Sequence, residues 1–257
     1  MPPRALVRRP SPRLADGLLT HLDRQPVDAD LALRQWEGYV AALAGEGWEV
    51  TEVPAAEDCP DSAFVEDTVV VYGDLAVISR PGAVERRPET AGTEQTLAGL
   101  GYRIARIEEP GTLDGGDVLK HDGKIWVGLG GRTNQSGLEQ LADLLGPLGA
   151  EVIGVPVKKV LHLKSAVTAL PDGTVIGFEP LVDDVSAWER FQPVPEEPGS
   201  HVVLLGGDAV LMSAAAPRSR ALFEERGLRV VAVDIGEFEK LEGCVTCLSV
   251  RLRHAPA

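Results

Sequence analysis

The chain has 257 residues, a size at which one globule can bury roughly 70–75% of its unfolded surface without disulfides or metals to hold it. Aromatic residues make up only 5% of the sequence, so aliphatic side chains must fill the core. The formal net charge of −14 argues against nucleic acid or an anionic membrane as a partner, because both require a basic surface, and it favours a small cationic ligand.

Cysteine content and the distribution of apolar residues bear on the compartment. The three cysteines are an odd number and suit a reducing environment, because structural disulfides are typical of oxidising ones. The N-terminal segment has no apolar stretch of the kind found in signal peptides, and no apolar run approaches the about 18 residues of a membrane span. These features predict a cytoplasmic protein.

Hairpin-like segments recur along the chain, each with two apolar strands around a short turn that contains Gly or Asp. Four of them span residues 68–79, 117–128, 166–177 and 201–213. Two further strands, over 4–9 and 246–253, lie near the two ends of the chain and could pair as a fifth hairpin.

Helical patterns, each followed by one more strand, lie between the hairpins. In the first, Leu33, Trp36 and Val40 recur at helical spacing, and in the third Thr133 and Asn134 supply cap residues. With their strands, these segments span 28–54, 88–109, 133–157 and 216–235. The sequence therefore predicts an α/β fold in which a hairpin, a helix and a strand repeat about five times.

Closure of such a ring through both termini predicts one domain, 1–257, with circular pseudo-symmetry. The Pro-rich stretch 191–200 is interpreted as a surface loop and not as a linker. In a radial repeat, loops and strand ends at the axis bring together residues that are distant in sequence. We therefore expect the functional residues near the axis.

Carboxylates stand at the entrance of the first hairpin. Glu66 and Asp67 directly precede an apolar run, and Asp61 lies shortly upstream. Buried carboxylates are unfavourable unless a cation or hydrogen-bond donors meet them. These residues could form a solvated turn that caps the strand, or a carboxylate cage for a guanidinium, whose planar fork of donors suits bidentate acceptors.

Two other segments carry candidate groups. Asp114 and Asp117 flank two glycines that would permit close approach of a ligand, although a turn with local Asp hydrogen bonds explains the pattern equally well. His162 is embedded in an apolar stretch ahead of a hairpin strand. A histidine in that setting is more often a satisfied core residue than a catalyst.

Cys244 and Cys247 lie three positions apart in front of the last strand. Zinc would require four soft ligands, and no second CxxC or HxxxH accompanies the pair, with Cys59 only a possible third ligand. A thioredoxin-like redox pair normally opens a helix, whereas the residues after Cys247 alternate as a strand does. A buried thiol and the nucleophile of a Cys/His site both fit the pattern.

Six segments occur in a characteristic order and spacing. They are FVEDTVVV (64–71), ISRPGAVERR (78–87), TLDGGDVL (112–119), GGRTNQSGLEQLADLL (130–145), LHLKSAVTAL (161–170) and EGCVTCLSV (242–250). Together they resemble the signature segments of dimethylarginine dimethylaminohydrolases, members of the guanidine-modifying (pentein) superfamily. The resemblance runs from about Leu6 to Arg251 and implies a fivefold α/β propeller of ββαβ modules.

The resemblance also implies site residues. It makes Cys247 the nucleophile, His162 the general acid and base, and Asp114 the carboxylate that orients the histidine. The substrate-binding residues it implies are Asp61, Glu66 and Asp67 for the guanidinium, Arg86 and Arg132 for the amino-acid carboxylate, the carbonyl of Leu241, and either Leu18 or Leu19 in an N-terminal flap. Cys244 falls where the family tends to have an aliphatic residue.

The activity that the resemblance implies is hydrolysis of asymmetric dimethylarginine and monomethylarginine to citrulline and dimethylamine or methylamine, through a covalent thiouronium. No metal or organic cofactor is expected, and the protein is expected to be a monomer or homodimer. Alternatives are an arginine deiminase-like hydrolase of another small guanidine or ureido compound, a non-catalytic ligand-binding pentein, and a zinc- or redox-active CxxC protein. A deiminase usually carries a helical insertion, for which 257 residues leave no room.

Overall fold

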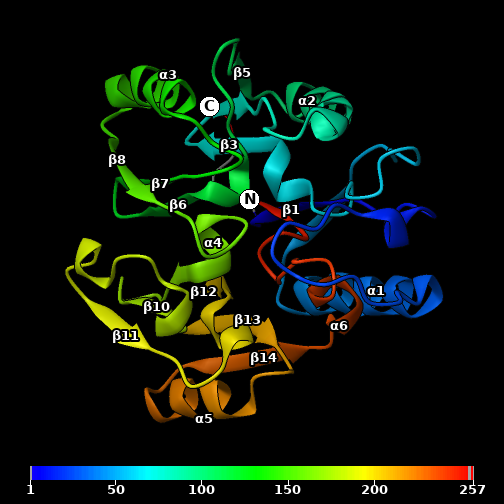
Figure 1. Ribbon diagram of the computed structural model, residues 1–257, viewed down its shortest axis with the longest axis vertical. Helices are drawn as coiled ribbons and strands as arrows, with labels where there is room; N and C mark the ends of the chain where they lie inside the picture. The colour runs from blue at the N-terminus through cyan, green and yellow to red at the C-terminus, as the bar shows by residue number, and fades with distance from the viewer. Residues whose placement is uncertain (1, 254–255, 257) are drawn as a thin grey trace.

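The computed structural model describes residues 2–253 and 256, which form five three-stranded sheets. Figure 1 shows the sheets arranged around a common centre, with the long helices at the periphery. Among the described residues, no helix has the length and apolar character needed to cross a membrane.

All five sheets share one topology: two strands pair antiparallel as a hairpin, and the third runs parallel to the middle one. The sheets are β15 (Val250–Leu252), β1 (Arg4–Val7) and β2 (Glu49–Glu52); β3 (Val69–Tyr72), β4 (Leu75–Ile78) and β5 (Arg103–Arg106); β6 (Val118–His121), β7 (Lys124–Leu129) and β8 (Glu151–Pro156); β9 (Val167–Ala169), β10 (Val175–Gly177) and β11 (Phe191–Pro193); and β12 (Val202–Gly206), β13 (Ala209–Ser213) and β14 (Arg229–Val233). The predicted pairing of the two chain ends is confirmed by the antiparallel register of β1 with β15.

Helices connect the middle and third strands in four of the modules. They are α1 (Ala29–Gly45), α2 (Thr90–Gly99), α3 (Gln135–Leu145) and α5 (Pro217–Glu225), and two short helices, α4 (Leu163–Ala166) and α6 (Gly236–Glu239), lie in loops. Capping side chains explain two of the starts. Asp28 accepts a hydrogen bond from the amide of Leu31, and Asn134 accepts one from the amide of Gly137.

The fourth module departs from the predicted repeat. Two short 3-10 turns, Glu179–Leu181 and Val185–Ala187, replace a helix between β10 and β11. The interpretation of 191–200 as a surface loop was wrong for part of this stretch, because β11 pairs with β10 and Ser200 is buried. Pro193 is tolerated because it lies at the end of an edge strand.

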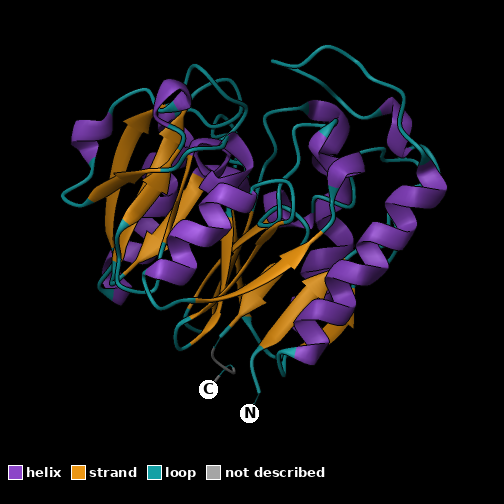
Figure 2. Ribbon diagram, turned by 90° about the horizontal axis from the view of Figure 1, so that it is seen from below, coloured by secondary structure: helices purple, strands orange, loops and turns teal. Residues whose placement is uncertain are grey.

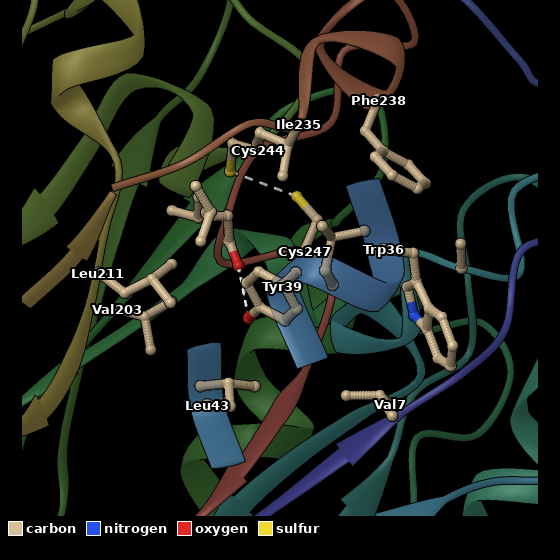
Figure 3. Close-up of a cluster of buried hydrophobic side chains, with 14 of the residues drawn as sticks. Val7, Trp36, Tyr39, Leu43, Val203, Leu211, Ile235, Phe238, Cys244 and Cys247 are labelled. Carbon is tan, nitrogen blue, oxygen red and sulfur yellow. Dashed lines mark hydrogen bonds between the residues drawn. The ribbon is translucent and has the colours of Figure 1, made fainter. Parts of the chain in front are cut away.

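The largest buried cluster of apolar side chains lies between α1 and the C-terminal segment, and Figure 3 shows part of it. Tyr39 of α1 is fully buried there, and its hydroxyl donates to the carbonyl of Val245 at 2.9 Å and lies 2.7 Å from the hydroxyl of Ser249. Burial of one large apolar side chain contributes about 1.5–3 kcal/mol. This packing fixes the turn that carries Cys244 and Cys247.

Candidate active site

Residues from distant parts of the chain line one small cavity. Its walls are Leu18, Asp61, Phe64, Asp67, Arg86, Arg132, Leu161, His162, Leu241, Glu242, Gly243 and Cys247. All the site residues named from the sequence are in this list except Asp114, which lies behind His162, and Glu66. Of the two flap candidates, Leu18 lines the cavity, whereas Leu19 packs against the apolar cluster of α1.

Cys247 sits at the end of a tight turn that starts at Cys244. The amide of Cys247 donates to the carbonyl of Cys244 at 3.1 Å, and the two sulfur atoms lie 3.4 Å apart. This hydrogen bond between the thiols, together with burial, raises the pKa of Cys247 well above its ordinary value. The same bond, aided by the charge of His201 against the effect of burial, lowers the pKa of Cys244 to about 5. Within the pair, the thiol of Cys244 is therefore the more acidic one.

Both ring nitrogens of His162 face carboxylates. Nε2 lies 3.0 Å from Oδ2 of Asp114, and Nδ1 lies 3.7 Å from Oδ1 of Asp67. Burial lowers the pKa of His162, but the charges of Asp67, Asp117 and Asp114 outweigh it and raise the pKa to about 9. The imidazole is therefore protonated at neutral pH.

The second glycine of the DGGD segment makes this arrangement possible. A Cβ atom on Gly116 would lie 2.6 Å from both Nδ1 of His162 and Oδ1 of Asp67. The amide of Gly116 also donates to that same Asp67 oxygen at 2.8 Å. Only a residue without a side chain lets the imidazole and the carboxylate approach this backbone.

Asp114 is fully buried and held by its neighbours. One carboxylate oxygen accepts from the amide of Gly82 at 2.9 Å, and the amide of Asp114 donates to the hydroxyl of Thr133 at 3.1 Å. That hydroxyl in turn donates to Asp117 at 2.6 Å, and Asp117 accepts from the amide of Leu163 at 2.9 Å. Burial raises the pKa of Asp117 to about 6. The side chain of Asp117 thus fixes the segment that carries His162 through contacts distant in sequence, and not through the local turn hydrogen bonds considered from the sequence.

Arg86 is almost saturated by acceptors of the protein itself. Nη1 contacts Asp67 at 2.5 Å, Nε and Nη2 contact the carboxylate of Glu89 at 3.1 and 2.8 Å, and Nη2 also reaches the carbonyls of Asp61 and Phe64. Since a guanidinium has five N–H groups, at most one on Nη1 is left for a ligand. Arg86 therefore builds the floor of the cavity.

Arg132 has more capacity to bind a ligand. Its Nη1 lies 3.6 Å from Asp114, too far for a hydrogen bond, and this buried nitrogen has no hydrogen-bond partner within the described part of the chain. A buried guanidinium with unused donors is well suited to a carboxylate.

An N-terminal loop covers the cavity as a flap. Both carboxylate oxygens of Asp61 accept from the amide of Leu18, at 3.2 and 3.1 Å. The carboxylate of Glu242 accepts from the three successive amides of residues 20–22. The remaining volume is about 10 Å³, close to that of one water molecule. A guanidine substrate can enter only if this flap opens.

The side chain of Glu66 points away from this cavity. It contacts Nζ of Lys164 at 2.5 Å and the guanidinium of Arg251. These groups line a separate cavity of about 510 Å³ bounded by residues of β3, β6, β9, β12 and β15. Only the backbone of Glu66 reaches the site, through its amide, which donates to the carbonyl of Cys247 at 3.1 Å.

Known proteins close in sequence place the chain in a family. No family model matches it. However, the N(G),N(G)-dimethylarginine dimethylaminohydrolase of Streptomyces coelicolor is 64% identical over 250 residues, which cover 97% of each chain. This chain belongs to the dimethylarginine dimethylaminohydrolase family. The enzyme of the same name from Pseudomonas aeruginosa is 34% identical over 251 residues, 96% of this chain and 98% of that one.

Solved structures of the dimethylarginine dimethylaminohydrolase family share the fold. That of the Pseudomonas aeruginosa protein, a Cys-to-Ser mutant complexed with citrulline, has a TM-score of 0.90 at 32% identity and covers 98% of this chain and 100% of its own. The N-terminal domain of ArgZ, a cyanobacterial arginine dihydrolase, has a TM-score of 0.88 at 20% identity, covers 100% of this chain and 99% of its own, and shows likeness of fold alone. The predicted fivefold propeller is thus confirmed.

Asp67, Asp114 and His162 also place their potential ligand atoms within 4.8 Å of one another, close enough to surround a metal ion. A metal would need a lone pair on a neutral imidazole. Here both nitrogens face carboxylates and the pKa of about 9 keeps the ring protonated, so the group fits an ion-pair network better than a metal site. For this member of the dimethylarginine dimethylaminohydrolase family, a metal-free reaction remains our prediction.

Sequence reasoning missed several residues of the site. Phe64, Leu161, Glu242 and Gly243 line the cavity, and Glu89 holds Arg86. Glu89 had a usable signal, since an acid three residues after an arginine on a helical turn is a common ion pair. Glu242 had none, because its backbone adopts φ of 61° and its partners lie in the distant flap.

Proposed function

We propose that this protein hydrolyses N-omega-methylated arginine, as asymmetric dimethylarginine or monomethylarginine, to citrulline and dimethylamine or methylamine. The observation that carries the proposal is the convergence of Cys247, a protonated His162 and the carboxylates of Asp61 and Asp67 on one cavity under a flap. A cysteine, an imidazolium and carboxylates are the groups that displacement of an amine from a guanidinium requires.

Binding comes first. The guanidinium of the substrate lies against Asp61 and Asp67, and its carboxylate pairs with Arg132, with at most one N–H from Arg86. The substrate cation stabilises a thiolate at Cys247 and lowers the pKa of that thiol. The thiol of Cys247 therefore loses its proton to the solvent as the substrate arrives.

The Cys247 thiolate then attacks the central guanidinium carbon. His162 donates its proton to the departing methylated amine, and the collapse of the adduct leaves a thiouronium on Cys247. The neutral imidazole next removes a proton from the attacking water, and expulsion of the thiolate gives citrulline. Since Asp67 lines the cavity and Asp114 does not, Nδ1 is the nitrogen that we infer to exchange the proton.

The test is a panel of methylated arginines, arginine and agmatine, with citrulline and the amine products identified. We expect turnover of the methylated arginines without added metal and loss of turnover in Cys247→Ser. Cys244→Ala is the matched control and should stay active. Preference for arginine or agmatine would instead favour the deiminase-like alternative, and binding without turnover would favour a ligand-binding pentein.

The location and assembly of the protein are part of the same proposal. We propose a cytoplasmic monomer or homodimer. We also propose that it binds neither nucleic acid nor anionic membranes, which the net charge of −14 supports. Light scattering of the purified protein should give the mass of one or two chains.

A further inference from the structure

The two thiols of the CxxC segment are placed as if to join. Their sulfur atoms lie 3.4 Å apart, and Figure 3 shows both in the apolar cluster near Ile235 and Phe238. The hydrogen bond from the amide of Cys247 to the carbonyl of Cys244 closes a turn of the kind that brings its end Cα atoms within about 7 Å. A disulfide needs Cα atoms within about that distance and sulfurs about 2.05 Å apart. The sulfurs must therefore approach by only about 1.4 Å.

Cys244 is the more readily ionised of the two thiols, even without a substrate. Oγ1 of Thr246 lies 3.3 Å from the sulfur of Cys244, and the hydrogen bond from Cys247 lowers the pKa of Cys244 to about 5. The thiolate is the form that reacts with peroxides. A reactive sulfur thus lies directly beside the proposed nucleophile.

Cys244 has no part in the hydrolytic mechanism proposed above. The hydrolysis requires one sulfur, one imidazole and carboxylates. Nothing in that chemistry explains a second thiol in contact with the first one.

We propose that Cys244 and Cys247 form a modification site, in which a hydroperoxide converts the two thiols to a reversible disulfide that switches hydrolysis off. In the first step, one thiolate attacks an oxygen of the peroxide and becomes a sulfenic acid, while the O–O bond breaks and the other oxygen takes up a proton and leaves as water, or as an alcohol if the hydroperoxide is organic. The second thiol then attacks that sulfur, forming the S–S bond and releasing water. Two electrons pass from the sulfurs to one peroxide molecule, and a small dithiol returns them when it reduces the disulfide. The predicted loss of activity rests on the proposed function, whereas the formation of the disulfide does not depend on which substrate the protein hydrolyses.

The disulfide inactivates Cys247 reversibly and also protects it from irreversible oxidation. A sulfenic acid with no neighbouring thiol is open to further oxidation to sulfinic acid, which dithiols do not reverse. With Cys244 in contact, condensation competes with that second oxidation. The Cys244→Ala variant should therefore be active before exposure to peroxide and be inactivated irreversibly by it.

The test uses the purified full-length protein, hydrogen peroxide and then dithiothreitol. Trypsin cleaves after Lys240 and Arg251 and so releases both thiols in one peptide, 241–251. In the wild-type protein we expect this peptide to lose two hydrogen atoms in mass, to resist alkylation, and to recover both its mass and the citrulline-forming activity after dithiothreitol. In Cys244→Ala we expect the same peptide to gain two or three oxygen atoms and the activity to stay lost.

Cys59→Ala is the matched control. Burial raises the pKa of Cys59, so its thiol is not activated and the variant should behave as the wild type does. If Cys244→Ala does not fold, Cys244→Ser replaces it, and activity before oxidation checks either variant. A wild-type peptide that gains oxygen without losing two hydrogens, or full recovery of the Cys244 variant, would overturn the proposal. The mass and alkylation results stand even if methylated arginine proves not to be the substrate.

Discussion

Replacing Asp114 with asparagine tests whether the buried carboxylate keeps His162 protonated. The substitution preserves size but removes a charge 3.0 Å from Nε2 of the imidazole. Hydrogen bonds to charged groups are worth about 1.5–3 kcal/mol, which corresponds to about 1–2 pKa units. From its present value of about 9, we expect the pKa of His162 to fall to roughly 7–8.

The sign of the effect on catalysis follows from the role of His162 as an acid. The wild-type rate should decline as the pH rises through about 9, where the imidazolium loses its proton. In Asp114→Asn this alkaline limb should move down by about 1–2 pH units. At pH 6 the activity of the variant, relative to the wild type, should therefore be higher than it is near pH 9. The assay is kcat/KM for citrulline release against pH, together with an NMR titration of the histidine ring.

Asp74→Asn serves as the control, because Asp74 pairs with Arg103 on the surface and should leave the pH profile unchanged. An alkaline limb that stays in place in folded Asp114→Asn would refute the reasoning. It would mean that Asp67 and Asp117 alone set the charge of His162.

Three other predictions concern stability and the flap. The folded pKa of His162, about 9, exceeds its ordinary 6.5, so its protonation contributes about 3 kcal/mol to the free energy of unfolding. This contribution is complete below pH 6.5 and disappears as the pH rises through 9. In urea denaturation, the difference in free energy of unfolding between the wild type and His162→Gln should therefore become smaller over that range. A difference that stays constant with pH would contradict this prediction. Glu242→Gln should weaken the hydrogen bonds to the amides of residues 20–22 and so loosen the flap. We expect kcat/KM to fall by up to about tenfold and tryptic cleavage after Arg24 to become faster. An unchanged rate of cleavage would show that Glu242 does not hold the flap closed. Tyr39→Phe removes the hydroxyl that donates to the carbonyl of Val245 and should lower the free energy of unfolding by about 1–3 kcal/mol. The midpoint of denaturant unfolding measures this loss, and an unchanged midpoint would contradict the prediction.

Local patterns explain why the fold was predictable. The hairpin turns contain residues that accept positive φ, such as Gly73 at 58° and Asp122 at 48°, and short apolar strands flank them. The ring closure was predictable because strands near both ends lacked any other partner. The fourth module was not, since its edge strand β11 is only three residues long and contains a proline.

Neighbouring carboxylates show where sequence reasoning stops. Glu66 and Asp67 share the 3-10 turn Val65–Thr68, yet Asp67 faces the site and Glu66 faces Lys164 and Arg251. The orientation of Glu66 depends on cations nearly a hundred residues or more away along the chain, and that of Asp67 depends on Arg86 and His162. The pattern of two acids before a strand holds no information about those partners.

The charge around the cavity explains why a cation should bind there and how binding should respond to pH. The carboxylates at and directly beneath it are Asp61, Asp67, Asp114, Glu89 and Glu242, and the cations are Arg86, Arg132 and His162. Five carboxylates against three cations leave an excess of negative charge, and burial raises the pKa of both Asp61 and Glu89. A guanidinium beside Asp61 compensates part of that excess and favours the ionised carboxylate. Binding of the substrate should then release a proton from the fraction of Asp61 that is protonated, so the affinity increases with pH until Asp61 is ionised in the free protein.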